Sequence, residues 1–152
     1  MTIKIKNRKA YRDYEIEEEY EAGIVLKGPE VKSVRQGKAS LRQAYARVID
    51  NEVWILSMHI TPYDNKGYTD LNPRRRRKLL LHKHQIKRLR KKTEISGYTL
   101  VPLKLFINEK GKIKLIIGLA KGRREYDKKQ YLIEKQMDRD KQRELREWQK
   151  KH

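Results

Sequence analysis

Five consecutive cations, Arg74 to Lys78, form the densest chemical feature of the chain. Adjacent like charges repel one another unless they are solvated or face an anion. Arginine suits phosphate because its planar guanidinium can donate two parallel hydrogen bonds. Leu79, Leu80 and Leu81 follow directly and would anchor the run to an apolar core. We therefore expect this segment to hold phosphate-binding side chains at a fixed place on the surface.

Two further segments combine cations with small residues. Between Gly118 and Lys129, glycine and alanine flank a cation cluster, so a sugar-phosphate chain could approach the backbone closely. Residues 28–38 place one carboxylate, Glu30, among basic side chains. Two interpretations of Glu30 stay open. It forms a structural ion pair, or it orients a neighbouring base or arginine within an RNA site.

Residues that would support catalysis are sparse. The chain has no cysteine, which excludes disulfides, thiolate metal ligands and a cysteine nucleophile. A nuclease needs converging carboxylates or paired histidines, but Glu17, Glu18 and Glu19 lie in a strand pattern, whose successive side chains point to opposite faces. His82 and His84 fit a solvated or RNA-facing pair better than a metal site. We expect no enzymatic activity, no cofactor and no bound metal.

The positive charge is concentrated in the second half of the chain. Residues 1–70 carry 12 Lys and Arg against 11 Asp and Glu, whereas residues 71–152 carry 27 against 9. Such an excess destabilises a compact domain by self-repulsion, so it usually marks a surface that binds a polyanion. Nucleic acid is the leading candidate. A membrane surface is the weaker alternative. A lipid-binding basic helix needs a strong face of Trp, Phe and Leu, and the few Trp and Phe residues of this chain are scattered.

No targeting or membrane signal is evident in the sequence. The first residues lack the apolar stretch of a signal peptide. Unbroken apolar runs are far shorter than the about 20 residues of a membrane-spanning helix. We expect a soluble, cytoplasmic protein.

Short segments with alternating or β-branched apolar residues predict strands. They lie at residues 13–18, 23–26, 45–49, 52–56, 100–107 and 112–119. The polar pair Asp50-Asn51 and the loop at 108–111 join the last four segments into two hairpins. Many short strands with regular turns indicate a mainly β fold, a small OB-like β-barrel.

Two or three helices should accompany the barrel, with the clearest patterns at 30–35 and 83–92. Every glycine and proline lies at or before Gly122. We therefore expect an RNA-binding barrel over residues 1–126 and a tail of mixed charge over residues 127–152. The apolar stripe of the tail is too thin to dock firmly. We expect the tail to be disordered when free and helical against a partner.

Several motifs occur in an order that is similar to one protein family. They are Asn7-Arg8-Lys9-Ala10, Gly23 to Leu26, Glu30-Val31-Lys32-Ser33 with Arg35, Gly37-Lys38-Ala39, Asn72-Pro73 through Lys83, Val101-Pro102-Leu103-Lys104 and Gly118 through Lys128. Over residues 7–130 the chain resembles the small protein B family, the bacterial SsrA-binding proteins that partner tmRNA in trans-translation.

The resemblance implies an OB-like barrel that binds the tRNA-like domain of tmRNA near its D-loop and elbow. In that family the complex enters a ribosome stalled on an mRNA without a stop codon. The body of the protein stands in for the missing anticodon arm at the decoding site, and the tail folds into a helix along the empty mRNA channel. The tmRNA contacts carried over by motif are Glu30, Leu80, His82, Lys114 and Gly122.

Two positions depart from the family pattern. The Asp-Lys-Arg signature at the start of the tail falls on Asp127, Lys128 and Lys129, so one arginine is replaced by lysine. Lysine keeps the charge but loses the bidentate fork, and we expect a phosphate contact to survive while a shape-specific one weakens. His82 stands where some members have asparagine. Either side chain can hydrogen-bond, but histidine can also gain charge.

These arguments together give a set of candidate contacts. The candidate RNA-binding residues are Glu30, Lys32, Arg35, Lys38, Arg74, Arg76, Lys78, Leu80, His82, Lys83, Lys114, Lys121, Gly122, Arg123 and Arg124. The candidate ribosome contacts in the tail are Asp127, Lys128, Lys129, Leu145 and Trp148. A ribosomal protein that binds rRNA constitutively is the nearer alternative, although extensions that thread rRNA tend to be purely basic. We expect no membrane partner and no small-molecule substrate.

Overall fold

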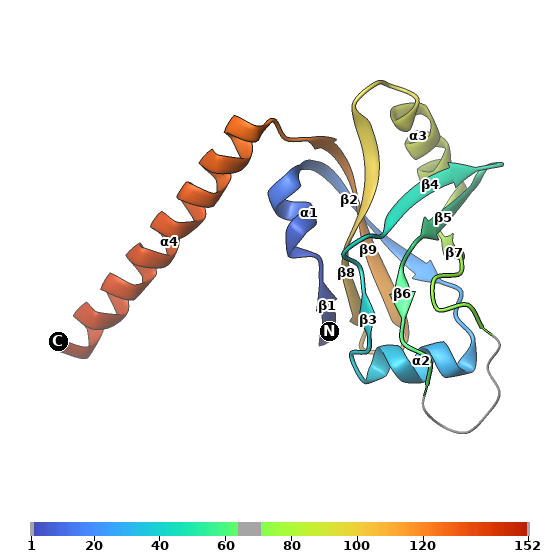
Figure 1. Ribbon diagram of the computed structural model, residues 1–152, viewed down its shortest axis with the longest axis horizontal. Coiled ribbons are helices and arrows are strands. Elements are labelled where there is room, and N and C mark those ends of the chain that lie inside the picture. Colours follow the sequence, from blue (N-terminus) through green and yellow to red (C-terminus); the bar gives the residue numbers. More distant parts are fainter. Residues whose placement is uncertain (1, 64–70, 152) are drawn as a thin grey trace. The chain divides into compact units, whose positions relative to one another are not determined.

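The main sheet of the computed structural model closes into an antiparallel barrel (Figure 1). The structure describes residues 2–63 and 71–151, without the side chains of residues 125, 126 and 151. The strands of this part of the chain are β1 (Thr2–Lys6), β2 (Tyr14–Ile24), β3 (Ala39–Ser40), β4 (Tyr45–Ile49), β5 (Glu52–Leu56), β6 (His59–Ile60), β7 (Arg77–Leu80), β8 (Tyr98–Ile107) and β9 (Ile113–Gly122). Its helices are α1 (Arg8–Asp13), α2 (Gly28–Arg35), α3 (Lys83–Thr93) and α4 (Glu125–Lys151).

Strand pairing runs around the barrel from β8 through β4, β5, β7, β2 and β9 and returns to β8. β1 pairs with the C-terminal half of β8, and β3 pairs with β6 in a small separate sheet. The predicted mainly β class is confirmed. The seam between β4 and β8 is thin, because within the described residues these strands pair only through Ala46 and Leu100.

The two predicted hairpins are confirmed and supply most of the core. In the β4–β5 hairpin, Asp50 and Asn51 have φ angles of 51° and 60°, the left-handed values that a two-residue turn requires. Val53 and Ile55 alternate with outward-facing residues along β5, and both are fully buried. The β8–β9 hairpin contributes buried leucines from both of its strands to the same core.

β2 differs from the prediction, because residues 13–18 and 23–26 do not form two strands. A single strand runs from Tyr14 to Ile24 and pairs with β9 along its length. A β-bulge between Ile16 and Glu18 shifts the register. The bulge lies inside the first predicted segment and does not separate the two. Residues 19–22, which the prediction left out, continue the strand and its alternation of more and less exposed side chains.

The expected helices α2 and α3 are confirmed, and they lie at opposite ends of the barrel (Figure 1). Leu89, on the inner face of α3, is fully buried. The short helix α1 was not expected. Its N-cap is Asn7. The buried Asn7 side chain accepts a hydrogen bond from the Ala10 N–H and donates one to the Pro102 carbonyl at 2.9 Å.

The tail is helical in the structure, and its disorder when free stays an expectation. Helix α4 runs unbroken from Glu125 to Lys151. Residues 123–152 contain neither glycine nor proline, and pairs such as Gln136 with Asp140 at 3.1 Å add local support. Its Trp148 is 62% exposed, so local propensity rather than core packing holds this helix.

The chain divides into two units, Met1–Gly122 and Arg123–His152. None of the helices in the described ranges is long and apolar enough to cross a membrane.

Candidate nucleic-acid interface

The arginine run alternates between the interior and the surface. Arg77, the first residue of β7, is fully buried, and the Arg75 side chain is 23% exposed. Arg74 and Arg76 are exposed. This is the period of an extended chain, in which successive side chains point to opposite faces. Only alternate arginines of the run are therefore available to an external phosphate.

The two inward arginines converge on Glu30. The Arg77 Nε donates to Glu30 Oε2 at 2.6 Å, and the Arg75 Nε lies 3.2 and 3.1 Å from the two carboxylate oxygens. Arg75 Nη2 also donates to Glu30 Oε1. The remaining guanidinium donors of Arg77 reach the Met58 carbonyl at 2.7 Å and the Pro73 carbonyl at 3.0 Å. The ion pair that the sequence left as one interpretation of Glu30 is present.

Glu30 also caps the start of α2. Its Oε1 accepts a hydrogen bond from the Lys27 N–H at 3.0 Å, which satisfies a free donor at the helix start. Burial alone would raise the pKa of Glu30, but hydrogen bonds from Arg75, Lys27 and Arg77 lower it below the ordinary value. Glu30 is therefore a charged carboxylate inside the protein, held by cations on one side and a helix on the other.

The outward members of the run lie over the neighbouring strands. Arg74 donates to the Gln43 side chain at 3.1 Å. The Arg76 guanidinium lies 4.6 Å from the centre of the Trp54 ring. Lys78 forms an ion pair with Glu52 at 3.0 Å. These cations therefore have defined positions instead of extending freely into solvent.

Leu80 and Lys114, which are far apart in sequence, meet across Gly23. In the sheet Gly23 of β2 pairs with Leu80 on one side and with Lys114 on the other. A Cβ at Gly23 would lie 3.2 Å from the Leu80 Cβ, so a glycine gives the Leu80 side chain room here. These residues line a hollow of about 360 Å³ together with Val31 of α2. Leu80 is 53% exposed beside it.

Arg35 connects α2 to the rim of this hollow. Its Nη2 donates to the Gly111 carbonyl at 3.0 Å, in the loop between β8 and β9. Lys32 lies 5.3 Å from the ring of Tyr63, and Lys38 is exposed beyond the end of the helix. The cations of residues 28–38 thus point away from the buried Glu30.

The remaining barrel candidates lie elsewhere on the surface. Gly122 and Lys121 are at the opposite end of β9 from Lys114, about 25 Å away at ordinary strand rise. Lys121 rests 4.6 Å from the centre of the Tyr98 ring. The structure therefore does not bring the five carried-over tmRNA contacts into one pocket.

His82 is the N-cap of α3, and its ring stacks on that of His84 with centroids 5.6 Å apart. Lys83, the first residue of the helix, is exposed.

In the second unit, Arg123 lies 4.5 Å from the centre of the Tyr131 ring. The Arg124 carbonyl accepts a hydrogen bond from the Lys128 N–H at 3.0 Å. The side chains of Asp127, Lys129, Leu145 and Trp148 are exposed along α4.

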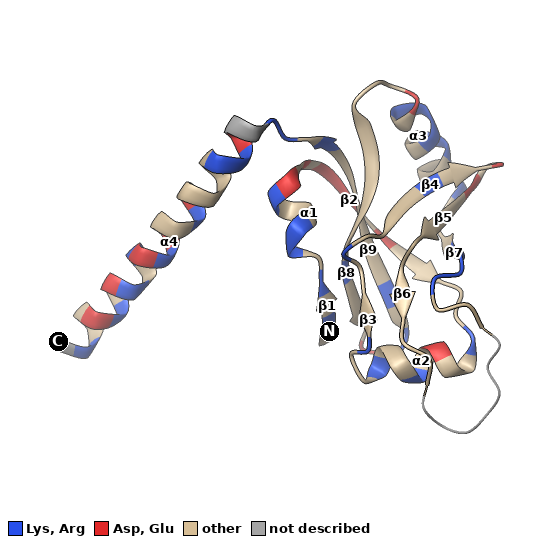
Figure 2. Cartoon of the chain, viewed as in Figure 1, with Lys and Arg blue, Asp and Glu red and all other residues tan. Residues whose placement is uncertain are grey.

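The charges of the barrel are segregated by element. Figure 2 shows Lys and Arg on α2, on α3 and before β7, with Asp and Glu on β2. Glu19 and Glu21 are exposed on that strand. Glu18 bonds to Arg88 and Tyr20, and the Arg88 hydrogen bond is the main cause that lowers the pKa of Glu18 to about 2. Glu18 is therefore paired with Arg88.

No group of three or more His, Cys, Asp or Glu side chains that could hold a metal ion occurs among the described residues.

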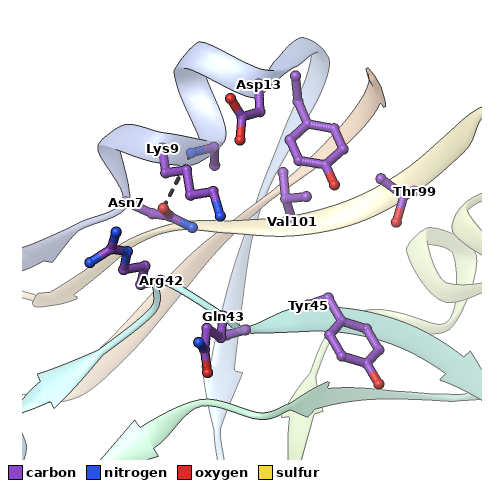
Figure 3. Close-up of a pocket in the computed structure, with 11 residues that line it drawn as sticks. Asn7, Lys9, Asp13, Arg42, Gln43, Tyr45, Thr99 and Val101 are labelled. Carbon is purple, nitrogen blue, oxygen red and sulfur yellow. Dashed lines mark hydrogen bonds between the residues drawn. The ribbon is translucent and has the colours of Figure 1, made fainter. Parts of the chain in front are cut away.

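A second hollow, of about 380 Å³, lies between α1 and the β4–β8 seam (Figure 3). Lys9, Arg42, Tyr45 and Thr99 are among the residues around it. Asn7, Lys9, Ala10 and Val101 belong to the family motifs, but sequence reasoning gave this region no role, because its residues come from three distant segments.

Sequence reasoning also did not select Trp54 as a candidate RNA-binding residue. The signal was available, since a two-residue turn at Asp50-Asn51 fixes the hairpin register and places Arg47 opposite Trp54.

Comparison with known proteins shows extensive similarity. The family model described as SmpB protein matches residues 4–147. An SsrA-binding protein of Thermus thermophilus is 50% identical over 125 residues, which cover 82% of this chain and 87% of the relative. One of Symbiobacterium thermophilum is 49% identical over 141 residues, covering 93% and 89%. A solved structure described as "tmRNA-SmpB: a journey to the center of the bacterial ribosome" is 49% identical, covers 84% of this chain and 93% of that one, and has a TM-score of 0.67.

We expect the substitution Glu30→Ala to destabilise the barrel by about 3–5 kcal/mol, because it leaves the buried Arg77 charge without its partner. The free energy of unfolding, from urea denaturation followed by circular dichroism, measures the loss. The matched control is Arg76→Ala, which removes an exposed arginine one residue away and should change stability by about 0.5 kcal/mol at most. Equal small effects of both substitutions would contradict the role assigned to Glu30.

Proposed function

Because the chain belongs to the SmpB protein family, we propose that it binds tmRNA and acts with it in trans-translation on stalled ribosomes. Its partners are the tRNA-like domain of tmRNA and the ribosome. It is an RNA-binding factor, and the barrel uses its cations to neutralise phosphates rather than to catalyse a reaction. It needs no cofactor, and its place is the cytoplasm, where ribosomes work.

The observation that carries the proposal is the meeting of Leu80 and Lys114 across Gly23. Motif comparison alone selected the leucine and the lysine, which are 34 positions apart in the sequence. On β7 and β9, the two strands that flank β2, they give an apolar side chain and a cation on one open surface. A base or ribose can pack on the leucine while the lysine neutralises a nearby phosphate. Glu30 acts indirectly at this site, since it positions the arginine run.

The tail is the part that we assign to the ribosome. Lys128 and Lys129, close to the start of α4, and Leu145 and Trp148, near its end, are the contacts we propose, with Asp127. A 27-residue helix is about 40 Å long. It can therefore follow an extended channel while the barrel stays on the tRNA-like domain.

Recovery of cellular RNA with the protein tests the proposal against its nearest alternative. We expect purification of the full chain from cells, followed by RNA sequencing, to enrich one tRNA-like RNA, tmRNA. Enrichment of bulk rRNA in its place would show a ribosomal protein that binds rRNA constitutively.

Truncation after Tyr126 separates the two parts of the proposal. We expect the shortened protein to bind tmRNA with nearly unchanged affinity, because the barrel residues that we assign to RNA lie before that point. Tagging on stalled ribosomes in a reconstituted translation system should be lost. Equal loss of RNA binding and tagging would show that the tail belongs to the tmRNA-binding surface.

Lys114→Ala should weaken tmRNA binding and reduce the slope of log affinity against log salt by about 1, the effect of one lost phosphate contact. Filter binding at several salt concentrations measures both quantities. Lys4→Ala is the matched control, since it removes the same charge from β1, outside the hollow. An identical response of the two variants would show that net charge, not the Leu80–Lys114 surface, determines affinity.

A further inference from the structure

The outer face of β4, β5 and β7 carries a row of side chains that joins Lys78, already a candidate, to two residues that the proposed site does not use. Arg47 of β4 pairs with Trp54 of β5, and Trp54 pairs in turn with Lys78 of β7. Ala46, Val53 and Leu79, the residues that alternate with them, are buried. Arg47, Trp54 and Lys78 therefore all point away from the core, side by side in register. We refer to this row as the Trp54 row.

A second row beside it has the same character. Tyr45 pairs with Leu56 on the same face and is 42% exposed. The Arg76 guanidinium lies 4.6 Å from the Trp54 ring centre. Aromatic rings next to cations, on an open antiparallel sheet, are the chemistry by which proteins bind unpaired bases together with their phosphates.

The face is continuous with the proposed tmRNA surface through β7. Lys78 belongs to the Trp54 row, and Leu80, two residues later on the same strand, lies at the hollow with Gly23 and Lys114. From β9 to β4 the surface crosses four interstrand steps, about 19 Å. An RNA that occupies the hollow therefore needs little further extent to reach Trp54.

Charge gives this extension a direction. Along β2 from the hollow, the exposed Glu19 and Glu21 present negative charge to an approaching phosphate. On the other side, among the paired residues of β4, β5 and β7, Glu52 is the one acidic side chain of the outer face, and Lys78 neutralises it at 3.0 Å. A polyanion is repelled along β2 and attracted over β7 toward β4.

From this arrangement we infer that the tmRNA footprint extends across β7 onto β5 and β4, where Trp54 packs against a base of the RNA and Arg47 and Arg76 face its phosphates. The inference rests on the proposed tmRNA binding and names further residues of that interface. Cation–π contacts are weak at exposed sites, so Arg76 can leave the Trp54 ring for a phosphate as a base takes its place.

The chain offers a direct probe of this contact. It has 2 tryptophans, Trp54 and Trp148, so the full-length Trp148→Phe protein reports on Trp54 alone. We expect a transcript of the tRNA-like domain of tmRNA to quench its fluorescence in a saturable manner, with the same midpoint as binding measured by mobility shift. Binding without a change in Trp54 fluorescence would overturn the extended footprint and leave the proposed function standing.

Substitutions supply an independent measurement. Trp54→Ala should weaken binding of the transcript about 5- to 150-fold, the range found when a base-stacking aromatic is removed. Because this change can also disturb the hairpin, Arg47→Ala serves as a second variant, with Arg8→Ala as the matched arginine control on α1. Weakening by Arg47→Ala but not by Arg8→Ala supports the footprint, and equal affinities overturn it.

Two other outcomes have defined meanings. Quenching of Trp54 by ribosomes but not by the transcript would assign the face to a ribosomal partner and overturn the inference. Failure of the Trp148→Phe protein to bind the transcript at all would overturn tmRNA binding itself, and the extended footprint with it.

Discussion

The carboxylate of Glu30 joins the start of α2 to the arginine run at the start of β7. It accepts the N–H of Lys27 at the start of α2 and the guanidinium groups of Arg75 and Arg77 at the start of β7. A carboxylate with this little exposure is costly to bury unless cations and donors fill its lone pairs. Here they do, and the helix and the arginine run are fixed relative to one another. This buried contact therefore also determines where the neighbouring, solvent-facing arginines lie.

One consequence is that successive arginines of the run have different roles. Arg75 and Arg77 are used for folding, whereas Arg74 and Arg76 remain on the surface. The inward pair is neutralised by Glu30, which limits the self-repulsion that five adjacent cations would otherwise cause. The same strand then continues to Leu80 at the hollow. Structural and RNA-facing residues thus alternate along a few positions of one extended segment.

Much of the barrel could be predicted because local signals and the fold agree. The Asp50-Asn51 turn, the alternation around it and the breaker-free final segment each depend on neighbours in sequence. The inward orientation of Arg77 could not be predicted this way, since its reason is a carboxylate 47 positions earlier. The continuity of β2 through residues 19–22 depends on pairing with β9, a segment that is distant in the sequence. For the candidate interface, motif resemblance selected Leu80 and Lys114, but only the sheet register explains why Gly23 must lie between them.

The thin seam between β4 and β8 gives the barrel an unequal resistance to opening. Every other junction around the ring is held by more than the one residue pair that Ala46 and Leu100 provide within the described chain. Backbone hydrogen bonds that are few and near the surface open at the lowest free energy. Thermal fluctuation should therefore open the barrel first between β4 and β8. The backbone amide protons of this seam should exchange with solvent earliest. The β4–β5 hairpin borders this seam, so its β4 edge is where the barrel should open first.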